Sequence, residues 1–67
     1  MRDPRKNPQA GDTIRKGTAT RVITRTVTRV KGGDIHYKVV EGGSEKCAWI
    51  TTWQTWARDA SVVHTTA

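Results

Sequence analysis

The amino-acid sequence predicts a mainly β fold: a small, SH3-like, strongly bent antiparallel sheet or partly open barrel with one short C-terminal helix. Residues 20–40 contain two runs of alternating side chains folded about Gly32-Gly33. Glycines also separate further short β-prone segments, and tryptophans recur at steps of three and four near the C-terminus. Short strands at close spacing, divided by glycine turns, are typical of small barrels and bent sheets.

The hairpin is the clearest element. Strands are expected near residues 20–30 and 35–40, because glycine takes positive φ without a steric clash and Gly32-Gly33 suits a two-residue turn. The predicted pairs are Lys31–Asp34, Val30–Ile35, Arg29–His36, Thr28–Tyr37 and Thr26–Val39. The predicted core face carries Val22, Thr24, Thr26, Thr28, Val30, Ile35, Tyr37 and Val39. The opposite face carries Arg21, Arg25, Arg29, His36 and Lys38, with Ile23, Val27 and Val40 between them.

The segments around the hairpin divide the chain into an arm, a domain and a tail. Residues 1–10, with two prolines and no periodicity, are expected to form an extended basic arm. Residues 11–60 are expected to form a single small domain, in which 13–16, closed by Gly17, and 45–49 are further strands and Ile14 points inward. The step from Thr24 to Thr26 is a candidate bulge. Residues 61–67 lack a stop signal and are predicted to fray.

A short helix is predicted from about residue 52 to residue 60. Trp49, Trp53, Trp56 or Ala57, and Ala60 recur at helical spacing, and Thr51 or Thr52 is the expected N-cap. The predicted inner face of the hairpin is rich in threonine and cannot form a dry core alone. The sequence therefore assigns Trp53 and Trp56 a structural role, whereas Trp49 could either pack or stack on a base.

The charge balance indicates an anionic partner. Twelve Lys and Arg face six Asp and Glu, for a net charge of +6, and such a field recruits polyanions, although net charge also serves solubility. Arg21, Arg25 and Arg29 are four residues apart and should share one side of a strand. No acidic residue lies between Thr13 and Gly33. This face is either a phosphate-binding surface or a solvated face that discourages strand aggregation.

The predicted binding residues are Arg21, Arg25, Arg29, His36 and Lys38, with Arg5 and Lys6 of the arm as additional phosphate contacts. The predicted partner is DNA or RNA, bound with little sequence preference. The sequence does not decide between a single-stranded and a double-stranded nucleic acid. The alternative is an adaptor or inhibitor that uses the same arginines to dock on an acidic surface of a host protein.

Enzymatic chemistry is not expected. His36 and His64 are isolated, Cys47 has no histidine at a recognisable spacing, and no zinc signature, P-loop or nucleophile motif is present. We therefore expect no cofactor, no metal and no small-molecule substrate. No apolar run approaches the length of a membrane span and no signal-peptide core is seen, so no membrane partner and a cytoplasmic location are expected.

The opening residues carry a family resemblance. Asp3-Pro4-Arg5-Lys6-Asn7-Pro8-Gln9-Ala10-Gly11-Asp12 resembles the start of small uncharacterised proteins of tailed phages and prophages, which begin with a D-P-R-x-N-P-x-x-G-D motif. An Arg-Lys-Gly strand end, an arginine-rich hairpin and the segment Trp53-Gln54-Thr55-Trp56-Ala57 extend the likeness. The resemblance implies an accessory phage protein in the cytoplasm of a host bacterium. It assigns no catalytic or binding residue.

Overall fold

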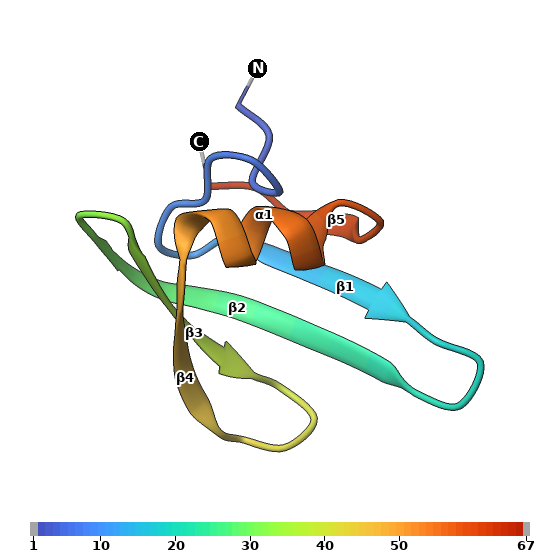
Figure 1. Cartoon of the computed structure of the whole chain (residues 1–67). Coiled ribbons are helices and arrows are strands. Elements are labelled where there is room, and N and C mark those ends of the chain that lie inside the picture. The colour runs from blue at the N-terminus through green and yellow to red at the C-terminus, as the bar shows by residue number, and fades with distance from the viewer. Residues whose placement is uncertain (1, 67) are drawn as a thin grey trace.

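Five strands form one antiparallel sheet, and a short helix lies across one of its faces (Figure 1). The structure is a computed structural model and describes residues 2–66. The elements are β1 (Thr13–Gly17), β2 (Val22–Lys31), β3 (Asp34–Val39), β4 (Glu45–Trp49), α1 (Ile50–Ala57) and β5 (Ser61–His64). The strand order is β4-β3-β2-β1-β5, so β4 and β5 are edges and the sheet is open. The mainly β class with one short helix is confirmed, whereas closure into a barrel is not observed.

A β-bulge in β2 changes the predicted register of the hairpin. The pairs nearest the turn, down to Arg29–His36, form as expected, but Tyr37 then lies opposite Val27 instead of Thr28. Thr28 is an extra residue on β2, and the predicted pairs Thr28–Tyr37 and Thr26–Val39 are wrong. One inserted residue inverts the alternation of every β2 side chain that precedes it.

The buried face of the sheet follows from this inversion. Val27, Ile35 and Tyr37 are buried, as are Ile14 of β1 and Trp53 of α1. On β3 the predicted inward residues are confirmed. On β2 Thr24 and Thr26, predicted to face the core, lie on the opposite side, and Ile23 and Val27 face the core instead. The core is therefore less polar than the sequence pattern suggested.

The helix begins directly after β4, earlier than expected. Trp49 is the N-cap and makes no side-chain capping hydrogen bond, so the predicted caps Thr51 and Thr52 are wrong. The backbone N–H of Ile50 instead donates to the carbonyl of Gly33 at 2.7 Å, so the hairpin turn satisfies one free N–H of the first helical turn. Trp53 and Ala57 face the core, as the spacing predicted.

The N-terminal and C-terminal segments are joined to each other. The predicted arm forms a hydrogen-bonded turn after Asp3 and packs on the domain, with Pro4 and Pro8 buried. The predicted frayed tail is wrong for residues 61–64, because they pair with β1 as strand β5. The buried carboxylate of Asp12 holds this junction. It accepts hydrogen bonds from the Arg2 guanidinium and from the backbone N–H groups of Gln9 and Thr66.

Candidate nucleic-acid interface

The face of the sheet opposite α1, called the outer face here, gathers cations from three strands. Pairing register places these side chains on it: Arg15 from β1; Thr24, Thr26, Arg29 and Lys31 from β2; Asp34, His36 and Lys38 from β3; and Glu45, Cys47 and Trp49 from β4. A twisted antiparallel sheet with one packed and one solvated face produces this arrangement, because side chains alternate along each strand. The outer face therefore presents four lysine and arginine side chains to solvent.

The cations of the outer face are not neutralised by ion pairs. Within residues 2–66 the two salt bridges are Arg2–Asp12 and Arg5–Asp3, and both lie in the N-terminal segment. Asp34 and Glu45 share the outer face, but neither takes part in the two ion pairs of residues 2–66. The positive side chains are thus free to meet an external anion.

A third carboxylate approaches the outer face from the β3–β4 connection. Glu41 accepts a hydrogen bond of 2.6 Å from the backbone N–H of Thr24. This bond is the main reason that the pKa of Glu41 is lowered, and the nearby charge of Arg15 adds a smaller effect. Glu41 therefore adds a carboxylate near Arg15.

Three predicted site residues come together on the outer face. Arg29 lies directly opposite His36, and Lys38 is two residues further along β3 on the same side. Arg29 and Lys38 are exposed, and His36 is partly exposed. The hairpin turn near them has positive φ at Gly32 but not at Gly33, the pattern of a type II′ turn.

Arg21 and Arg25 do not join this group. Arg21 precedes β2 in the β1–β2 turn, where its backbone carbonyl accepts hydrogen bonds from the N–H and the hydroxyl of Thr18. Arg25 lies on the helix side of the sheet, opposite Ile14 and Val39. The predicted stripe of Arg21, Arg25 and Arg29 is therefore wrong, because the bulge at Thr28 separates Arg25 from Arg29.

Arg25 closes the aromatic core. Its guanidinium carbon lies 3.7 Å from the ring centroid of Trp56 and 4.3 Å from that of Tyr37, with Trp53 at 5.9 Å. Its Nε is buried and has no hydrogen-bond partner among residues 2–66. Burial lowers the pKa of Arg25, and Tyr37 offsets part of that effect. The side chain is a cation held by aromatic faces instead of by a carboxylate.

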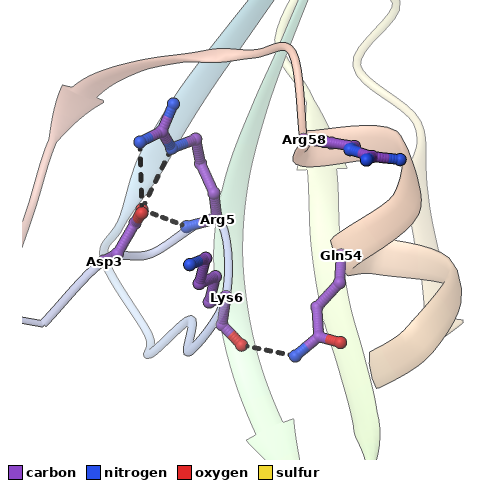
Figure 2. Close-up of a pocket in the computed structure, with 5 residues that line it drawn as sticks. All are labelled: Asp3, Arg5, Lys6, Gln54 and Arg58. Atoms are coloured by element: carbon purple, nitrogen blue, oxygen red, sulfur yellow. Dashed lines mark hydrogen bonds and ion pairs between the residues drawn. The ribbon is translucent and has the colours of Figure 1, made fainter.

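The two predicted arm residues border a separate pocket of about 370 Å³ between the N-terminal segment and α1 (Figure 2). The Arg5 guanidinium bonds Asp3, which raises the pKa of Arg5 and lowers that of Asp3. Gln54 donates to the backbone carbonyl of Lys6 at 2.8 Å. Figure 2 shows the Arg58 guanidinium directed away from that of Arg5. The cations around this pocket do not converge on one point, and its hydrogen bonds serve to dock the arm.

Sequence reasoning missed two cations of the outer face. Arg15 was assigned only to a short strand, and Lys31 only to the turn. Thr13–Gly17 pairs with β2 through Arg15 and Thr24, which no local pattern specifies. Trp49 was predicted both at the end of a strand and at helical spacing, and the structure ends β4 at Trp49 and begins the helix at Ile50.

Two further side chains with reactive or titratable groups, Cys47 and His36, share the outer face. Cys47 and His36 are cross-strand neighbours, a juxtaposition that their sequence spacing does not reveal, and Cys47 is exposed. Across residues 2–66, no group of three or more His, Cys, Asp and Glu is placed to hold a metal ion. No helix of the described chain is long and apolar enough to cross a membrane.

No protein-family model, curated protein or solved structure matches this chain. The arrangement of its own residues is therefore the basis for a functional proposal.

Proposed function

We propose that this chain is a non-enzymatic, phage-encoded accessory protein that binds nucleic acid in the cytoplasm of a host bacterium. The outer face of the sheet would contact phosphates through Arg15, Arg29, Lys31 and Lys38, with His36 between them. The open sheet would act as an SH3-like scaffold, and the opening motif supports the phage origin. The observation that carries the proposal is a solvent-facing group of cations from three strands that have no ion-pair partner among residues 2–66.

The structure supports contacts to the phosphate backbone more than sequence readout. The one helix of residues 2–66, α1, packs on the other face of the sheet, so the outer face presents a sheet surface and no helix for the major groove. Arginine and lysine contacts to phosphates position a protein but carry no sequence information. Weak sequence preference and strong salt dependence are the expected consequences.

The salt dependence can be given a magnitude. Four phosphate contacts give a slope of log affinity against log salt of about −3.6 for a duplex and about −2.8 for a single strand. Raising salt from about 50 to about 200 mM should then weaken binding by roughly 50- to 150-fold. A surface that merely aids solubility has no such slope, because it retains no oligonucleotide at either salt concentration.

The test is fluorescence anisotropy with labelled DNA and RNA over this salt range. Lys38→Gln should reduce the slope by about one unit. Lys46→Gln is the matched control, because Lys46 is an exposed lysine at the next register position on the helix side of the sheet. Equal losses from both variants, or no binding of any oligonucleotide at low salt, would overturn the proposal.

A second candidate is an adaptor that docks on an acidic surface of a host protein. It is favoured by the exposed indole of Trp49 on β4. β4 is an edge strand of the sheet, so a strand of another protein could pair with its edge. Edge pairing and a tryptophan anchor are common in protein recognition. This candidate predicts that the chain binds no oligonucleotide at low salt but retains a host protein in a pull-down, and that Trp49→Ala releases it.

A further inference from the structure

Trp49 differs from the other aromatic residues of the chain. Tyr37 and Trp53 are buried, and Trp56 is partly buried beneath Arg25 and Lys16. Trp49 has 56% of its surface exposed. An indole left in water loses the benefit of burial, and its position on the charged outer face is not explained by core packing.

The indole of Trp49 lies flat on Gly33. A Cβ placed on Gly33 would lie 2.6, 2.8 and 2.8 Å from three consecutive atoms of the six-membered ring. Nearly equal distances to three neighbouring atoms place the face of the ring, not its edge, against the glycine. Gly33 does not have positive φ, so the close approach of the ring, and not the backbone conformation, requires glycine here. One face of the indole is supported, and the exposed area belongs to the rest of the ring.

Trp49 lies at one end of the outer face, beside the cross-strand pairs that contain the cations. Trp49 lies opposite Asp34, which lies opposite Lys31, and the next row across the sheet contains Arg29 and His36. Asp34 is the one carboxylate of the Trp49 row, and it disfavours a phosphate immediately beside the indole. It does not disfavour an uncharged base, so the geometry separates a base position at Trp49 from a phosphate position at the row of Arg29, His36 and Cys47, which contains no carboxylate.

We infer that the outer face takes single-stranded nucleic acid, with one base stacked on the open face of Trp49 and the backbone running over the cations. The inference rests on the proposed function and names its substrate class. A duplex keeps its bases stacked inside and offers nothing for the indole, whereas each unpaired base presents a π face. Single strands therefore bind more tightly than duplexes of equal length.

The experiment compares a labelled oligo(dT) single strand of 12 nucleotides with a 12-base-pair duplex at one low salt concentration. Trp49→Ala should weaken single-strand binding by roughly 5- to 140-fold and leave duplex binding within about twofold. Trp49→Phe, which keeps an aromatic face, should recover most of the loss. Arg29→Gln should weaken both substrates, because phosphate contacts are common to them.

Two controls keep the result interpretable. Circular dichroism and the thermal midpoint establish that Trp49→Ala is folded, and Gly33→Ala provides an independent displacement of the ring through the clash described above. Equal affinity for single strand and duplex, or an unchanged single-strand affinity in Trp49→Ala, overturns this inference. In either case the proposed function still stands if binding to oligonucleotides depends on salt. Absence of binding to either substrate overturns the proposed function and this inference with it.

Discussion

Arg25 provides the sharpest test of the register described here. The sequence pattern places Arg25 beside Arg29 on a binding face, whereas the structure places it on the helix side against Trp56 and Tyr37. The two arrangements predict opposite phenotypes for Arg25→Ala. With the observed register, Arg25→Ala should destabilise the fold and leave phosphate binding unchanged. Arg29→Ala should weaken phosphate binding and leave the stability of the fold nearly unchanged.

The expected loss can be worked from the contacts of Arg25. A partly desolvated cation over aromatic rings contributes about 2 kcal/mol. Half-burial of the two stem methylenes that the substitution removes, Cγ and Cδ, contributes about 1 kcal/mol more. Release of the buried, unpaired Nε returns about 1 kcal/mol. The net destabilisation is about 2 kcal/mol, which for a domain of this size lowers the thermal midpoint by roughly 8 to 16 °C.

Thermal unfolding followed by circular dichroism, together with oligonucleotide anisotropy on the same samples, measures both effects. Arg25→Lys keeps the charge but loses the planar stacking surface, so it should recover only part of the stability. Arg29→Ala should shift the unfolding free energy by less than about 0.5 kcal/mol, since its side chain is exposed. The bulged register would be refuted if Arg25→Ala left the thermal midpoint unchanged and weakened oligonucleotide binding as much as Arg29→Ala does.

Two further predictions concern the Asp12 junction and the outer face. Burial alone would raise the pKa of Asp12, but hydrogen bonds from Arg2, Thr66 and Gln9 outweigh it and lower the pKa from 3.8 to about 2. A carboxylate with a lowered pKa stabilises the fold above its unfolded pKa, and this stability, about 2 kcal/mol, is lost as pH falls through about 4 to 2. Unfolding midpoints measured between pH 5 and 2 should therefore fall less steeply in Asp12→Asn than in the unmodified protein, and parallel profiles would contradict the role of Asp12. Cys47, the single cysteine, is exposed on the outer face, so a saturating oligonucleotide should slow its alkylation by a maleimide severalfold; an unchanged rate would move the binding surface elsewhere.

Local pattern was sufficient for much of the fold. The glycine turn at residues 32 and 33, the pairs down to Arg29–His36 and the inward position of Ile14 follow from alternation and turn chemistry alone. The helical spacing of Trp53 and Ala57 also identified the helix face that packs on the sheet. These features depend on neighbours within a few residues, which is why the sequence was enough to determine them.

The features that the sequence did not determine depend on distant partners. A single extra residue at Thr28 exchanges the two faces of β2, and only packing against α1 decides whether Val27 or Thr28 is buried. Strand β5 forms because β1 offers an open edge, and Asp12 joins segments 54 residues apart. The charge of the chain was evident from its composition, but which arginines face solvent was decided by the tertiary structure. Burial of apolar surface favours the register that places Val27 inside, and that register carries Arg25 inward with it.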